Sequence, residues 1–169
     1  MRVTDEIRYQ ASPDAVFEML ADADFQERKC RATGAVEQQV DVVEHGDGEV
    51  TVTTERVMPT DSIPEMFRSV VGNSLRLVQV ESWYPADASG ARTGTIEVSI
   101  PGTPIGFSGE LQLSVDGPDG SLERIDGELK ARVPLIGGKI EQAVAPAIRA
   151  AIRAERRTGT AWLAEAAGG

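Results

Sequence analysis

Hydrophobic and polar residues alternate at the start of the chain. Val3, Ile7 and Tyr9 are separated by charged and polar residues. This period of two predicts a strand with one buried face. The segment 12–14, Ser-Pro-Asp, follows with a hydroxyl for a helix cap, a proline for the first helical position and an early carboxylate. A short helix is therefore expected directly after the first strand.

A second short helix is expected next. Asp22 is a suitable N-cap, and Phe25 and Cys30 supply apolar positions after it. Gly34 is well placed to end this helix. The predicted order up to this point is strand, helix, helix.

The period of two then returns. Val36, Val40 and Val42 share one face, and residues 45–48, His-Gly-Asp-Gly, form a turn signal. Apolar and polar residues alternate again over 50–54. These two segments predict an antiparallel hairpin.

Residues 58–72 break the strand pattern. Ser62 and Glu65 have the spacing of a capping box, and Gly72 is a natural stop. The pattern predicts a short amphipathic helix that acts either as a lid over an opening or as ordinary packing at the edge of the domain. Its apolar stripe consists of Ile63, Met66, Phe67, Val70 and Val71.

Four more strands and a long helix complete the chain. The strands are expected at 74–84, 92–100, 105–116 and 121–133, and short turns between them predict an antiparallel meander. Residues 136–166 carry a helical stripe, which at about 1.5 Å per residue predicts a helix of ~45 Å.

Two features of the long helix carry their own predictions. Pro146 lies inside it and predicts either a bend or a later helix start. The final residues, 166–169, are expected to fray.

Composition limits the class of protein. The chain has 169 residues, 41% of them hydrophobic and 26% charged, which predicts one globular domain over 1–169. Its formal charge of −10 argues against nucleic acid and anionic membrane partners. One cysteine permits no internal disulfide, and no long apolar run or export segment is seen. We expect a cytoplasmic protein without stable membrane insertion; the sequence does not predict its oligomeric state.

The order of the predicted elements resembles the helix-grip fold of the START-like (SRPBCC) superfamily, which includes plant pathogenesis-related allergens, polyketide cyclases and lipid-transfer domains. Residues 11–17, with Leu20 and Asp22, look like the superfamily's opening helix. Residues 133–141 and the closing Trp162-Leu163 resemble a smaller member family of unknown function.

The resemblance implies an α+β fold and a binding function. A curved antiparallel sheet of about seven strands would wrap around the long C-terminal helix, with two short helices after the first strand. In this fold the space between sheet and helix typically receives a small apolar or amphipathic molecule, and no cofactor is implied. Small alanine side chains on the helix would leave room for a ligand or allow close packing without a void.

Few residues suggest catalysis or metal binding. His45 is the single histidine and lies in a predicted solvent-exposed turn, while Cys30 is best explained as a buried structural residue. No clustered carboxylates suggest a metal site, and no serine-hydrolase or phosphate-binding motif occurs. No metal is therefore expected.

Glu155 is the one catalytic candidate. It falls on the apolar stripe of the long helix, where it would face the cavity as an acid or base with a raised pKa. The alternative is that Glu155 pairs with an arginine or lies beyond the sheet, and this alternative is favoured.

Several other side chains are candidates for ligand contact. Gln38 shares a face with valines, and Arg56 continues the inward face of its strand or lies on the rim. Only one of Trp83 and Tyr84 can point inward, and periodicity does not decide which. The complete predicted ligand-binding set is Gln38, Arg56, Phe67, Trp83, Tyr84, Ile148, Ile152 and Glu155.

The leading hypothesis for function is the binding of a small hydrophobic or amphipathic molecule, such as a lipid or polyketide-like compound, in an internal cavity. One alternative is a cyclase- or aromatase-like enzyme that uses an acid or base in the cavity. A third is a protein-interaction module of the chaperone-activator type, which would have a filled interior and an apolar outer patch.

Overall fold

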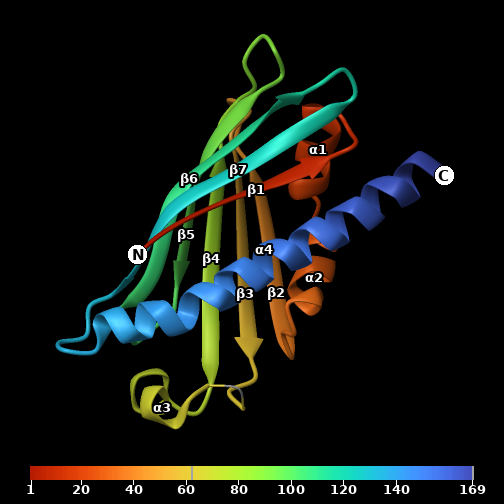
Figure 1. The fold of residues 1–169 in the computed structure, drawn as a ribbon. Coiled ribbons are helices and arrows are strands. Elements are labelled where there is room, and N and C mark those ends of the chain that lie inside the picture. Colours follow the sequence, from red (N-terminus) through yellow and green to blue (C-terminus); the bar gives the residue numbers. More distant parts are fainter. Residues whose placement is uncertain (62, 169) are drawn as a thin grey trace.

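Seven antiparallel strands form one curved sheet with the order β1-β7-β6-β5-β4-β3-β2 (Figure 1). The computed structural model describes residues 1–61 and 63–168. Consecutive strands from β2 to β7 are neighbours, and β1 pairs with β7, so the predicted meander is confirmed. The strands are β1 (Arg2–Tyr9), β2 (Glu37–Glu44), β3 (Val50–Met58), β4 (Leu75–Trp83), β5 (Arg92–Ser99), β6 (Ile105–Asp116) and β7 (Gly120–Ala131).

The helices of the described residues lie on one face of the sheet and at one end of it. The long helix α4 (Gly137–Gly168) crosses the sheet, and α1 (Pro13–Leu20) and α2 (Ala23–Ala32) lie beside its C-terminal half (Figure 1). The short helix α3 (Glu65–Val71) lies beyond the adjoining ends of β3 and β4. This arrangement is the predicted α+β helix-grip fold.

The two short N-terminal helices begin where the sequence predicts. The Ser12 hydroxyl accepts a hydrogen bond from the Ala15 N–H at 3.2 Å, and the Asp22 carboxylate accepts one from the Phe25 N–H at 3.0 Å. Each cap satisfies a backbone donor that the first helical turn leaves free. The caps therefore fix where α1 and α2 start relative to β1.

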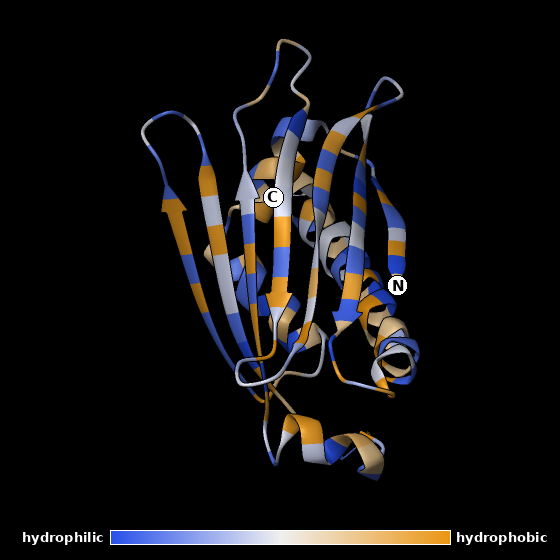
Figure 2. Ribbon diagram, turned by 90° about the vertical axis from the view of Figure 1, so that its left-hand side faces the viewer, coloured by the Kyte–Doolittle hydropathy of each residue, from blue (hydrophilic) through white to orange (hydrophobic). Residues whose placement is uncertain are grey.

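The core lies between the concave face of the sheet and the helices. Hydrophobic and hydrophilic residues alternate along the strands, as the bands of colour in Figure 2 show. Burying one large aliphatic or aromatic side chain contributes roughly 1.5–3 kcal/mol, so the inward faces hold the sheet against α4. Fully or nearly fully buried core residues include Val3, Ile7, Leu111, Leu113, Leu129 and Ile140.

Helix α3 begins later than the hydrophobic pattern predicts. Its first residue is Glu65, with Pro64 at the N-cap. A residue that precedes proline is disfavoured in helical conformation, which explains why Ile63 is excluded from the helix. Met66 is 59% exposed and does not belong to the buried stripe. The predicted cap residue Ser62 lies outside the described residues.

Helix α4 is continuous through Pro146, so a helix start after this proline is wrong. Proline removes the hydrogen bond to the carbonyl of Gln142, four residues earlier, and both residues are exposed, so water can bind that carbonyl. The helix also continues to Gly168, and Gly169 lies outside the described residues. Among the helices described, none has the length and apolarity to cross a membrane.

Strands β6 and β7 approach each other closely at two glycines. Gly109 and Gly127 are opposite each other in register. The Phe107 ring packs directly on Gly127, where a Cβ atom would collide with it. The absence of a side chain at this position therefore determines where the Phe107 ring lies.

Candidate functional site

A cavity of about 560 Å³ lies between the sheet and α4. This volume is within the range of about 300–1,000 Å³ that small-molecule sites occupy. Most lining side chains are apolar and come from β4 to β7, from α3 and from α4. Examples from the sheet and α4 are Leu77, Val98, Phe107, Leu111, Ile148 and Ile152.

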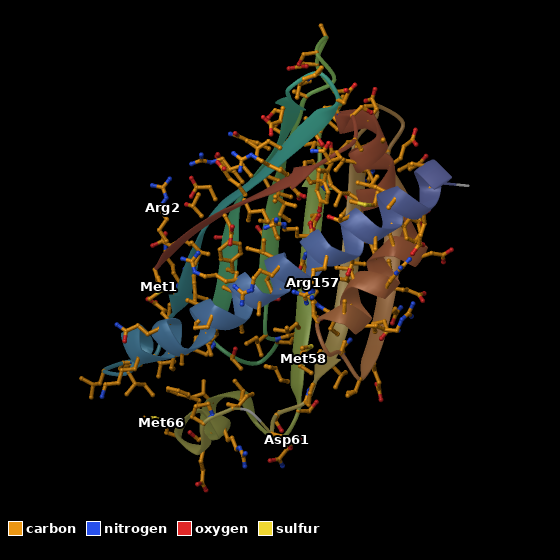
Figure 3. The ribbon with its side chains drawn as sticks, turned by 45° about the vertical axis from the view of Figure 1, so that its right-hand side comes forward. Met1, Arg2, Met58, Asp61, Met66 and Arg157 are labelled. Carbon is orange, nitrogen blue, oxygen red and sulfur yellow. The ribbon has the colours of Figure 1, made fainter. Side chains whose placement is uncertain are left out.

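One end of the cavity is covered by α3. Phe67 is buried there, and Met66 of the same helix lies on the outer side (Figure 3). No polar side chain from α3 lines the cavity among the described residues. We call this region the apolar end, which consists of Ile63, Phe67, Val70, Val71, Leu75 and Leu77.

The wall becomes polar along β4 with distance from α3. Leu75 and Leu77 are followed on the same face by Gln79 and Glu81, and all four side chains line the cavity. This change leads into a group of polar and charged residues that are all buried. We call it the polar cluster, which consists of Lys29, Arg56, Gln79, Glu81, Glu123 and Glu155.

Residues of β3 and β4 form a chain of hydrogen bonds in the polar cluster. Arg56 Nη2 donates to Gln79 Oε1 at 2.6 Å, and Gln79 Nε2 donates to Glu81 Oε1 at 2.6 Å. The indole N–H of Trp83 donates to Glu81 Oε2 at 3.2 Å. Both carboxylate oxygens of Glu81 therefore have donors from within the protein.

Lys29 on α2 connects β4 with α4. Its Nζ atom lies 3.0 Å from Glu155 Oε2 and 3.5 Å from Glu81 Oε1. Burial alone would lower the pKa of Lys29, but the negative charges of Glu155 and Glu81 outweigh burial and raise it above the ordinary value. The ammonium is therefore charged at neutral pH and holds three elements together.

Glu123 on β7 lies in surroundings that disfavour a charged carboxylate. Its side chain is buried, and burial followed by the negative charges of Glu155 and Glu81 raises the pKa of Glu123 well above its usual value. Lys29 acts in the opposite direction and does not offset these effects. The site therefore favours a protonated carboxyl at Glu123, which can donate a hydrogen bond.

The structure places five of the predicted site residues in the wall of the cavity: Arg56, Phe67, Ile148, Ile152 and Glu155. Arg56 is 5% exposed, so it lies inside the cavity and not on the rim. Glu155 both faces the cavity and is paired, although its partner is a lysine and not the predicted arginine.

Three predicted site residues, Gln38, Trp83 and Tyr84, do not line the cavity. Gln38 lies on the edge strand β2 and is half-buried, but its side chain is not part of the cavity wall. Trp83 points inward but is fully buried against Phe17 of α1, with which it makes an edge-to-face contact at 6.2 Å. Tyr84 follows the end of β4 and is 41% exposed, because successive residues point to opposite faces.

Four residues of the polar cluster were not predicted from the sequence: Lys29, Gln79, Glu81 and Glu123. Glu123 lies two residues before the buried Ile125, and Glu81 lies two residues before the buried Trp83. An acidic residue on the apolar face of a strand was therefore the available signal. Lys29 was considered only as a neighbour of Cys30, although its four-residue spacing from Phe25 places it on the buried face of α2.

The histidine and the cysteine lie outside the cavity. His45 is exposed at the hairpin turn and makes a 2.9 Å contact with Thr51 Oγ1. Cys30 is buried, and burial raises the pKa of its thiol, so the reactive thiolate is disfavoured. Within residues 1–61 and 63–168, no group of three or more metal-ligating side chains could hold a metal ion.

The sequence matches a known protein family. A family model described as "Protein of unknown function (DUF2505)" matches residues 4–163. An uncharacterized protein of Mycobacterium tuberculosis is 24% identical over 161 residues, which is 92% of each chain. An uncharacterized protein of Mycobacterium bovis matches to the same extent.

Comparison of the fold gives neighbours of low sequence identity. A protein of Thermus thermophilus aligns with a TM-score of 0.60 at 13% identity, over 95% of this chain and 98% of that one. A START superfamily protein from Mycobacterium smegmatis has a TM-score of 0.57 at 12% identity, over 96% and 98%. The di-domain ARO/CYC StfQ from the steffimycin biosynthetic pathway has a TM-score of 0.65 at 14% identity, over 99% of this chain and 52% of that one. These similarities confirm the helix-grip fold.

Proposed function

We propose that this chain, which belongs to the DUF2505 family of proteins of unknown function, binds a small hydrophobic or amphipathic molecule such as a lipid or a polyketide-like compound. The observation that carries the proposal is the cavity of about 560 Å³, which has apolar walls and one polar region. A concave apolar site with a few placed polar groups is the usual form of a small-molecule site.

The two parts of the cavity have different tasks in this proposal. The apolar body of the ligand packs on Phe67, Ile148 and Ile152, where burial contributes roughly 25 cal/mol per Å² before the cost of ordering the ligand. The polar group of the ligand lies at the polar cluster. Apolar contact thus supplies most of the affinity, and hydrogen bonds select the orientation.

Helix α3 is the element through which we expect the ligand to enter. It contributes only apolar side chains to the cavity among the described residues, and its exposed face carries charged residues such as Glu65 and Arg68. A short helix that separates an apolar hollow from water can move without breaking polar contacts to the polar cluster. This supports the lid hypothesis over simple packing at the domain edge.

A fluorescence titration tests the proposal. The neutral fluorophore N-phenyl-1-naphthylamine is expected to bind the wild-type protein in a 1:1 complex with increased emission. Ala151→Phe places a ring at a cavity-lining position of α4 and is expected to weaken this binding by about tenfold, because it fills the site. Ala161→Phe makes the same change at an exposed position of α4 outside the cavity wall and is expected to bind normally.

The proposal would be overturned if the wild type did not bind the fluorophore, or if both variants bound it as the wild type does. In the first case the cavity does not accept an apolar molecule of this size. In the second case binding occurs on another surface.

A cyclase- or aromatase-like enzyme is the second candidate function, and Glu123 is the observation that favours it. A buried carboxyl that is kept protonated in a cavity wall can act as a general acid toward a carbonyl oxygen. This alternative expects turnover that depends on the protonated form of Glu123. The protein-interaction alternative expected a filled interior, and a cavity of this volume does not support it.

A further inference from the structure

The buried guanidinium of Arg56 lacks the partner that such a group ordinarily has. Its side chain is in the cavity wall, 5% exposed, and its single hydrogen bond within the described residues goes to the neutral amide of Gln79. The Nε donor is buried with no partner there. Since a guanidinium has five N–H donors, most of its hydrogen-bonding capacity is unused by the described protein groups.

The surface arginines show the contrast. Arg2, Arg28 and Arg124 each lie within 4.0 Å of a carboxylate, and all three are far more exposed than Arg56. No such ion pair is formed by Arg56 with any described residue. A buried charge without an ion partner is expensive, because the loss of hydration is not offset by a salt bridge.

The acceptor oxygens of Gln79 and Glu81 are, in contrast, engaged by donors of the protein, whereas Glu123 Oε2 is buried without a partner. One carboxylate oxygen of Glu81 accepts a hydrogen bond from Gln79 and forms an ion pair with Lys29. The other oxygen accepts a hydrogen bond from Trp83. Glu155 Oε2 accepts a hydrogen bond from Lys29. The unused donors in this region lie at Arg56, and a ligand that complements them must bring acceptor oxygens.

We propose that the ligand is an amphipathic carboxylic acid, bound as its anion with the carboxylate against the guanidinium of Arg56 and the apolar chain directed toward α3. This inference rests on the proposed binding function and names its ligand class. A carboxylate can pair with a guanidinium through two parallel hydrogen bonds, which is the strongest complement to an unpaired buried arginine.

The charges around Arg56 are compatible with one added anion. Lys29 carries a positive charge close to Arg56, and Glu81 and Glu155 carry the negative charges. The remaining carboxyl of the polar cluster, Glu123, favours its uncharged form. A cationic ligand head would instead meet two buried cations, and the carboxylates of Glu81 and Glu155 already face Lys29.

Displacement of N-phenyl-1-naphthylamine by three ten-carbon probes tests the proposal. Decanoic acid, decan-1-ol and decylamine share a chain and differ in the charge of the head group. Decanoate is expected to displace the fluorophore from the wild type at about tenfold lower concentration than decanol or decylamine. Equal displacement by decanol, or preferential displacement by decylamine, would overturn the inference and leave the proposed binding function intact.

Two matched arginine variants locate the head group. Arg56→Met is expected to weaken displacement by decanoate by about 10- to 100-fold and to leave decanol unchanged, which also shows that the variant folds. Arg157 also lines the cavity but is exposed (Figure 3), so Arg157→Met is expected to keep the preference for decanoate. Loss of the preference in Arg157→Met and not in Arg56→Met would contradict the assignment.

A measurement on the wild type does not depend on how the variants fold. Decanoic acid labelled with ¹³C at the carboxyl carbon is expected to keep the chemical shift of a carboxylate at pH values below the pKa of the free acid, because the guanidinium favours the charged form. A bound ligand that titrates at or above the pKa of the free acid would overturn the inference. If the fluorophore itself does not bind the wild type, the proposed function fails before its ligand class is tested.

Discussion

The two ends of the cavity are built on different physical principles. At the apolar end, α3 covers the hollow with side chains such as Phe67, which interact through non-directional contacts. At the polar cluster, each engaged group has a defined partner, from Arg56 through Gln79 to Glu81 and from Lys29 to Glu155. The apolar end can therefore adapt to the shape of a ligand. The polar cluster can recognise the polar group of a ligand, but its paired side chains cannot easily rearrange.

Removal of Lys29 should have the largest effect on this comparison. Lys29→Met leaves the carboxylates of Glu81 and Glu155 buried without their cation, and we expect it to lower the free energy of unfolding by about 3–5 kcal/mol. Urea denaturation followed by circular dichroism measures this change.

The control for Lys29 is a surface pair. Arg31→Met removes an exposed contact to Glu27 at i,i+4 and is expected to change the urea midpoint very little. An equally small change for Lys29→Met would contradict the view that the polar cluster is a rigid end of the cavity.

Glu123 should make the stability of the protein depend on pH. The pKa of Glu123 is raised in the folded state. Above the ordinary pKa of glutamate, the folded protein therefore keeps a proton on Glu123 that the unfolded chain releases. The stability that this protonated carboxyl contributes is fully present below the ordinary pKa of glutamate. It is lost as the pH rises through the raised pKa of Glu123. In that window the free energy of unfolding should fall by up to about 1.4 kcal/mol per pH unit from this group.

Glu123→Gln isolates this contribution. The amide keeps the shape and the hydrogen-bonding ability of a protonated carboxyl but cannot ionise. Denaturation of both proteins across the pH range is expected to show a smaller decrease for the variant as the pH rises. Parallel curves for the two proteins would mean that Glu123 is not held in its protonated form.

Shortening of Phe67 should have the smallest effect. A phenylalanine in a tightly packed core loses about 3–5 kcal/mol on truncation to alanine, but Phe67 borders a cavity and its neighbours can relax. We expect Phe67→Ala to lower the free energy of unfolding by about 1–2 kcal/mol and to weaken fluorophore binding. Met66→Ala, on the exposed side of the same helix, should change neither quantity. If Phe67→Ala lowered the free energy of unfolding as much as Lys29→Met does, the apolar end would be as rigid as the polar cluster.

The fold was largely predictable because it depends on local periodicity. The alternation of Val3, Ile7 and Tyr9 locates β1, and the caps at Ser12 and Asp22 locate the helices after it. Errors arose where backbone chemistry overrides the hydrophobic pattern. Pro64 prevents Ile63 from joining α3, while an exposed Pro146 leaves α4 continuous.

The polar cluster was less predictable because its contacts join distant parts of the chain. The spacing of Glu155 placed it on the buried face of α4, but its partner Lys29 lies 126 residues earlier. Periodicity could not decide between Trp83 and Tyr84, since both faces of β4 mix polar and apolar residues. A sequence pattern assigns a residue to a face, and the curvature of the sheet decides which faces meet.

The contact between Phe107 and Gly127 suggests a simple route by which the capacity of the hollow can change. The ring rests on bare backbone, and it also forms part of the cavity wall. A larger residue at position 127 would collide with the Phe107 ring and with the backbone carbonyl oxygen of Ser108, so both the cavity wall and the local spacing of β6 and β7 would have to change. Relatives that differ at this position are therefore expected to differ in the room for a guest and in how closely these two strands approach.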